Sequence, residues 1–204
     1  MTTQSHLLLI RNHLRGILRK QKSRRHSYAI PSLWSPTKSK PLPNKLINVD
    51  PAEYFMKAID NVLRQKRTKS LHGTGGGWTR HAVIFNMFVR STCAFDHNGN
   101  RTLDLPLNSE GWRETGTFLK AIALLPYIKS LGTNTIHLLP ITSIGHDGNK
   151  GTLGSPYAIR NPYQLDENLS EPAVGIGVDE EFKAFVEGAH HLGMRIVVEF
   201  VFRT

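Results

Sequence analysis

Two segments in the second half of the chain carry apolar residues at the three- and four-residue spacing of one buried helix face. The first lies between Thr117 and Gly132, and its apolar positions are Phe118, Leu119, Ile122, Leu125, Ile128 and Leu131. Pro126 lies within this segment and lacks an amide donor, so we expect a kink or a restart of the helix there. In the second segment Asp179 is the expected helix cap, Gly193 is the expected stop, and the apolar stripe consists of Phe182, Phe185, Val186 and Ala189.

Three short apolar runs alternate with these helices and predict strands. The runs start near Ala82, Asn134 and Arg195, and they are rich in β-branched residues. The last run, residues 195–202, is almost continuously apolar, as expected for a parallel strand that is covered on both faces. Strands that alternate with helices predict an α/β fold with a parallel sheet.

The amino-terminal part of the chain is strongly basic. No acidic residue precedes Asp50, whereas seven arginines and lysines lie between Arg11 and Arg25, and the whole chain has a formal net charge of +10. Such a segment is compatible with binding to nucleic acid, with an anionic membrane surface or with organelle targeting. We favour a helix that docks on the rest of the fold and leaves its basic face in water, so we expect neither nucleic acid nor a membrane as a partner. The apolar face of this helix is predicted to consist of Leu7, Leu8, Leu14, Ile17 and Leu18.

The segment that follows the basic helix is punctuated by four prolines between positions 31 and 43, which predict an extended chain. Asp50 and Pro51 then fit the N-cap and first position of an amphipathic helix that runs to about Arg67. The glycine-rich residues 73–77 are neither preceded by a strand nor followed by Gly-Lys-Ser/Thr. We therefore interpret them as a hinge rather than a phosphate-binding loop.

The cysteine content and the hydropathy bear on the cellular compartment. Cys93 is the single cysteine, which excludes an intramolecular disulfide and fits a reducing cytoplasm. No feature places a base beside Cys93, so we interpret it as a small residue near a strand end. No apolar run approaches the ~20 residues of a membrane span. We predict a cytoplasmic protein.

A polar loop at residues 95–105 presents side-chain oxygens at two-residue steps. The candidate metal ligands are Asp96, Asn98, Asn100 and Asp104. This spacing could surround a hard cation such as calcium, and a polar turn without a metal is the alternative. No other cofactor is expected. In the connector that follows, Trp112 is interpreted as a packing residue rather than a sugar-stacking one.

Four stretches have recognisable sequences: AVIFNMFVR at 82–90, IKSLGTNTIHLLPI at 128–141, SPYAIRNPYQLD at 155–166, and residues 178–204. In this order they resemble the opening of the catalytic barrel of the α-amylase family. The resemblance is closest to the maltosyltransferase branch, of the 4-α-glucanotransferase type. It extends upstream to YAIPSLWSP at 28–36 and VDPAEY at 49–54.

The resemblance implies an incomplete (β/α)8 TIM barrel, of which this chain supplies the first three strands. A mainly helical amino-terminal subdomain would cover residues 1–77 and the start of the barrel residues 78–204. A complete barrel needs about 250 residues, so we expect the chain to be the amino-terminal part of a longer protein. The implied activity is maltosyl transfer between α-1,4-glucans or malto-oligosaccharides by a retaining mechanism. A hydrolase, or a non-catalytic glucan-binding remnant, is the alternative, and homo-oligomerisation stays open.

The resemblance also assigns roles to individual residues. A retaining mechanism needs two carboxylates about 5 to 5.5 Å apart, which in the family follow the fourth and fifth strands, so this chain alone should be inactive and contains no catalytic residue. Tyr157 matches a tyrosine that stacks against the sugar, and it follows a glycine-rich loop at 142–156 on the expected active face. Arg203 and Thr204 are further candidates for substrate binding. With Glu199 they stand where the family has Asp, Asn and His, so a metal at that motif is not expected.

Overall fold

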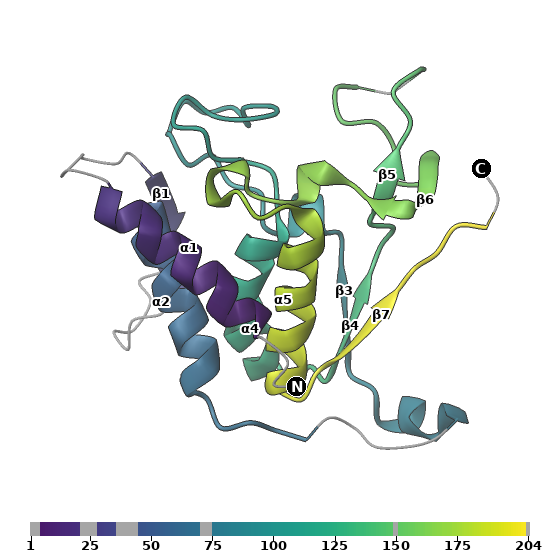
Figure 1. The fold of residues 1–204 in the computed structure, drawn as a ribbon. Coiled ribbons are helices and arrows are strands. Elements are labelled where there is room, and N and C mark those ends of the chain that lie inside the picture. Colours follow the sequence, from purple (N-terminus) through teal and green to yellow (C-terminus); the bar gives the residue numbers. More distant parts are fainter. Residues whose placement is uncertain (1–4, 21–27, 36–44, 70–74, 149–150, 203–204) are drawn as a thin grey trace.

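The computed structural model describes residues 5–20, 28–35, 45–69, 75–148 and 151–202 (Figure 1). Its centre is a parallel sheet in the order β3-β4-β7, formed by Ile84–Met87, Thr135–Leu138 and Arg195–Val198. Ile136 of β4 is the register partner of Phe85 on one side and of Ile196 on the other. The predicted α/β fold with a parallel sheet is confirmed for this part of the chain. The third strand is shorter than predicted, because its ladder ends at Val198.

Two helices connect these strands and pack against each other, α4 (Phe118–Ser130) and α5 (Val178–His191). Helix α4 continues through Pro126 as one element, so the restart that the proline suggested does not occur. The predicted cap of α5 was wrong: the N-cap is Gly177, and Asp179 lies in the first turn. There its carboxylate is near the positive end of the helix dipole, which also explains why an acid occurs at this position.

The amino-terminal helices α1 (His6–Lys20) and α2 (Pro51–Arg64) pack on the same layer, and α1 contacts both α2 and α5 (Figure 1). The prediction of a docked basic helix is confirmed, but the position of its apolar face was partly wrong. Leu7 and Leu14 are buried together with Ile10, whereas Leu8 is 45% exposed. Residues spaced by three and four share a helix face, and Leu8 points away from it.

The start of α2 follows the prediction. Asp50 accepts a hydrogen bond from the backbone N–H of Glu53 at 3.0 Å, and Pro51 occupies the first helical turn. The helix ends at Arg64 rather than near Arg67. Two short strands precede it, β1 (Tyr28–Pro31) and β2 (Leu46–Val49), which pair in antiparallel fashion. Most of the predicted proline-rich extended segment lies outside the described residues.

One hydrophobic core joins the amino-terminal elements to the layer that covers the sheet. Trp112 is 4% exposed and its ring stacks on Phe55 of α2 at 5.7 Å, which confirms the packing interpretation. Tyr28 of β1 stacks on His97 with 3.9 Å between the ring centroids. The core cluster thus contains residues from both sides of the predicted boundary at residue 77.

The remaining elements are short. Residues 75–81 form a 3-10 helix, so the part of the predicted hinge that lies in the described chain is helical. Helix α3 (Val89–Thr92) follows β3 directly. A two-stranded antiparallel unit, β5 (Thr142–Ile144) with β6 (Ile159–Leu165), was not predicted. Two further 3-10 turns, Glu167–Leu169 and Pro172–Val174, lead from β6 to α5. In the part of the chain described here, no helix has the length and apolar character needed to cross a membrane.

Candidate functional site

Tyr157 and Glu199 meet beyond the carboxyl ends of the parallel strands. Tyr157 lies between β5 and β6, and Glu199 directly follows β7, where its backbone N–H donates to the Leu138 carbonyl at 2.8 Å. The Tyr157 residue is 45% exposed, and the Glu199 carboxylate is close enough to its hydroxyl to affect the pKa of that group. Desolvation and this carboxylate raise the pKa of Tyr157 above its ordinary value, so the hydroxyl is protonated at neutral pH.

The loop that carries Tyr157 is held from α3, the short helix after β3. Arg90, in α3, is 8% exposed; its Nη1 donates to the Leu153 carbonyl at 2.5 Å and its Nη2 to the Gly154 carbonyl at 3.0 Å. Arg90 ends the recognisable stretch at residues 82–90, but the sequence alone assigned it no role. The guanidinium contact depends on how the chain folds back over some sixty residues, and no local pattern predicts it.

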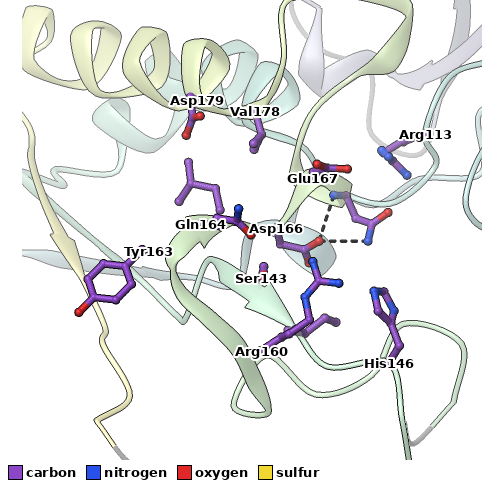
Figure 2. A pocket seen from close by; sticks show the side chains of 13 residues that line it. Arg113, Ser143, His146, Arg160, Tyr163, Gln164, Asp166, Glu167, Val178 and Asp179 are labelled. Atoms are coloured by element: carbon purple, nitrogen blue, oxygen red, sulfur yellow. Dashed lines mark hydrogen bonds between the residues drawn. The ribbon is translucent and has the colours of Figure 1, made fainter.

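A pocket of about 410 Å³ lies against the β5–β6 unit (Figure 2). Its polar lining includes both cationic and anionic side chains, and Figure 2 shows Arg160, Asp166 and His146 directed towards the same space. The Asp166 carboxylate accepts two hydrogen bonds of 3.0 Å from Asn168, one from its backbone N–H and one from its side chain. Tyr163 lies at the edge and is 94% exposed. Sequence reasoning missed this pocket because its residues come from several separate segments.

Buried charges fix the turns between β6 and α5 that form one wall of the pocket. The Glu181 carboxylate accepts hydrogen bonds from the backbone N–H of Glu171 at 2.8 Å and of Leu119 at 3.2 Å. Glu171 in turn accepts from the Thr117 hydroxyl at 3.1 Å, and Lys120 lies 3.8 Å away. Burial, reinforced by the charge of Glu171, raises the pKa of Glu181 to about 8. The pocket therefore has a wall that is tied to the amino terminus of α4.

The predicted calcium loop is closed by its own hydrogen bonds. Asp96 accepts from the backbone N–H groups of Gly99 and Arg101, both at 2.7 Å. Asn98 and Asn100 direct their side-chain nitrogens to Asp104, at 2.7 and 2.9 Å. Their oxygens would have to turn towards a cation to ligate it. Among the described residues, no group of three or more His, Cys, Asp or Glu side chains could hold a metal. Calcium binding stays a prediction.

Two other candidates from the sequence have simpler outcomes. Arg203 and Thr204, the remaining predicted substrate-binding residues, lie outside the described part of the chain. Cys93 is fully buried, and burial raises the pKa of its thiol to about 12. A thiol with this pKa is not a nucleophile at neutral pH, which supports the interpretation of Cys93 as a packing residue.

Comparison with known proteins gives partial matches, and no protein-family model matches the chain. The chain is 32% identical over 127 residues to the α-1,4-glucan:maltose-1-phosphate maltosyltransferase of Mycobacterium tuberculosis (strain CDC 1551 / Oshkosh), covering 59% of this chain and 16% of that protein. It is 30% identical over 131 residues to the chloroplastic isoamylase of Zea mays, covering 59% and 15%. The crystal structure of an α-amylase from Lactobacillus plantarum matches at 32% identity and a TM-score of 0.43, covering 60% of this chain and 23% of that one.

The maltosyltransferases among these relatives carry names that refer to α-1,4-glucans, and the chain spans about 16% of their length. The predicted resemblance to the α-amylase family is confirmed by these relatives, and maltosyltransferases are among them.

Proposed function

We propose that the protein acts on α-1,4-glucans as an α-amylase family enzyme, and that it transfers maltosyl units with retention through a covalent glycosyl intermediate. Its three parallel strands would be the first three of a (β/α)8 barrel, preceded by a mainly helical amino-terminal subdomain before residue 78. The observation that carries the proposal is the partly exposed Tyr157 ring, which lies near Glu199 beyond the carboxyl ends of these strands. The named relatives support the substrate class.

Tyr157 would contact the sugar through the face of its ring. One face of a glucose unit presents C–H groups, which pack well against an aromatic ring. The carboxyl ends of barrel strands are also where enzymes with this fold build their active sites.

The neighbouring pocket would accommodate hydroxyl groups of the glucan. A sugar hydroxyl is both a donor and an acceptor, so it can pair with the Arg160 guanidinium and with the Asp166 carboxylate alike. Tyr163 offers a second exposed ring at the edge. A mixture of opposite charges suits a neutral, polyhydroxylated ligand better than an ion of either sign.

Bond cleavage would need groups that these three strands do not supply. A retaining mechanism uses a nucleophilic carboxylate and an acid/base carboxylate, and the family resemblance assigns them to the ends of the fourth and fifth strands. We therefore propose that this chain supplies a binding wall and is inactive by itself. The choice between transfer and hydrolysis depends on whether a second glucan or water accepts the glycosyl group.

Calorimetric titration of the chain with maltoheptaose tests the binding role of Tyr157. We expect Tyr157→Ala to weaken binding about tenfold, because the ring contact is lost, and Tyr157→Phe to weaken it much less. Tyr127→Ala is the matched control: Tyr127 is 42% exposed, but it lies in the second half of α4, away from the carboxyl ends of the strands. Equal affinity of all variants would reject the stacking role. Failure of the parent chain to bind maltoheptaose would reject glucan binding itself.

A further inference from the structure

The base of the Arg90 side chain is fixed by an unusually close backbone contact. The backbone N–H of Gly116 donates to the Arg90 carbonyl at 2.7 Å. A Cβ atom at Gly116 would lie 1.8 Å from the carbonyl oxygen of Val89, so only glycine allows the two segments to pass at this distance. Val89 and the preceding Met87 are buried in the core. The guanidinium of Arg90 thus extends from a backbone that has little freedom to move.

The loop that Arg90 reaches is exposed. We define the Tyr157 loop as residues 151–158. Within it, the backbone N–H of Ala158 donates to the Ser155 carbonyl at 3.1 Å, and that of Tyr157 donates to the Ser155 hydroxyl at 3.2 Å. These bonds shape the turn but do not attach it to the sheet. Two contacts attach the loop to its surroundings. The Arg90 guanidinium binds the carbonyls of Leu153 and Gly154 in its first half, and the Gly145 N–H donates to the Ala158 carbonyl at its end, at 2.9 Å.

The chemistry of the guanidinium suits this task. Its planar fork donates to two successive carbonyls, Leu153 and Gly154, and so fixes the orientation of the chain as well as its distance. The guanidinium carbon also lies 5.3 Å from the centre of the Phe88 ring, within cation–π range. Burial lowers the pKa of Arg90, and the negative charge of Asp166 opposes this effect.

We propose that Arg90 is a positioning residue that holds the Tyr157 ring in place for the sugar. This inference rests on the proposed function, because Tyr157 is the residue that would contact the glucan. Arg90 itself does not touch the ligand. It acts by keeping the Leu153 and Gly154 carbonyls, which precede Tyr157, fixed against α3.

Hydrogen exchange tests the structural half of the proposal without any ligand. In Arg90→Lys the charge is kept but the fork is lost, so we expect amides of the Tyr157 loop to exchange at least about tenfold faster, while amides of α4 do not change. Arg113→Lys is the matched control: Arg113 is 7% exposed and also donates to two carbonyls, those of Ser170 and Pro106, on other loops. It should leave the Tyr157 loop unchanged. A folded Arg90→Lys chain with unchanged loop exchange would overturn the proposal.

A measurement on the parent chain covers the case in which Arg90→Lys does not fold. The Nη protons of a guanidinium that is held by two carbonyls exchange slowly and rotate slowly, so Arg90 should give resolved Nη–H resonances in a nitrogen-15 NMR spectrum. Averaged, rapidly exchanging resonances for Arg90 would contradict the contact on which the proposal depends.

A double-mutant cycle with maltoheptaose tests the functional half. We expect Arg90→Lys to weaken binding about fivefold in the parent chain and to have no further effect in a Tyr157→Ala background. An equal loss in both backgrounds would show that Arg90 does not act through Tyr157 and would overturn the proposal. If the parent chain binds no glucan, the proposed function fails, and the exchange experiment still decides whether Arg90 holds the loop.

Discussion

Replacing His97 with asparagine tests how a buried histidine connects the amino-terminal strand β1 to the rest of the fold. His97 is 1% exposed, and its Nδ1 lies 2.7 Å from the Ala29 carbonyl oxygen. A carbonyl only accepts, so Nδ1 carries the proton. Nε2, 3.1 Å from the Tyr28 hydroxyl, is then the acceptor of that O–H. Both ring nitrogens are therefore paired in the neutral form, and protonation would leave two donors facing each other.

The size of the effect follows from the pKa of His97. Burial, with a smaller contribution from the positive charge of Lys120, lowers this pKa from 6.5 to about 3. Between these two values the unfolded chain binds a proton that the folded chain does not, so the free energy of unfolding falls as the pH falls below 6.5. At about 1.36 kcal/mol per pH unit, lowering the pH from 7.5 to 4.5 removes about 3 kcal/mol through His97 alone.

Urea unfolding followed by tryptophan fluorescence at pH 7.5 and 4.5 measures this difference. His97→Asn should be less stable at pH 7.5 by about 2 kcal/mol, because the Tyr28 hydroxyl loses its partner and the ring stack is lost. Between pH 7.5 and 4.5, His97→Asn should lose about 3 kcal/mol less of its free energy of unfolding than the parent does. His13→Asn, at an exposed position of α1, is the control and should keep the full loss. Equal losses in the parent and in His97→Asn would refute the reasoning.

Three further predictions concern stability and reactivity. Gly116→Ala should lower the free energy of unfolding in urea by about 3 kcal/mol, because its new Cβ would collide with Val89. Gly77→Ala is the control and should have little effect, because its new Cβ meets nothing within 4 Å. Equal free energies of unfolding for the two variants would contradict this. Cys93 should not react with Ellman's reagent at pH 8 until urea unfolds the chain, and rapid native reaction would show that the thiol is accessible. Calcium should raise the melting temperature in the parent but not in Asp104→Asn, and an unchanged parent melt would reject the metal site.

Apolar patterns predicted the main elements, although the strands are less buried than expected. The last strand was predicted to be covered on both faces, but β7 is only partly buried and its Val198 is 39% exposed. The helices α4 and α5 and the three parallel strands were found from their apolar patterns. The errors at Leu8 and Asp179 are local. Leu8 belongs to an apolar run at the start of α1 in which composition does not identify the buried face. Asp179 is a good cap by residue type, but the helix begins after Gly177, whose positive φ of 82° turns the chain into it.

The site was less predictable because its contacts are long-range. Strand β6 is mostly exposed and pairs with β5 through an irregular register, so it lacks the alternation that identifies a strand. Tyr157 was found through the family resemblance, but its proximity to Glu199 joins residues from two separate strand connections. The Arg90 contact could not be predicted, since an arginine after a strand gives no indication of which carbonyls it will reach.

Maltotetraose turnover by the complete protein that carries this sequence tests the central claim most directly. The protein is incubated with maltotetraose and the products are separated by chain length. Maltosyl transfer predicts early products that differ from the substrate by two glucose units, both longer and shorter, with little net gain in reducing ends. A rise in reducing ends without longer chains would indicate hydrolysis and reject transfer. Maltotetraose left unchanged would contradict the assignment of the protein as a maltosyl-transferring enzyme.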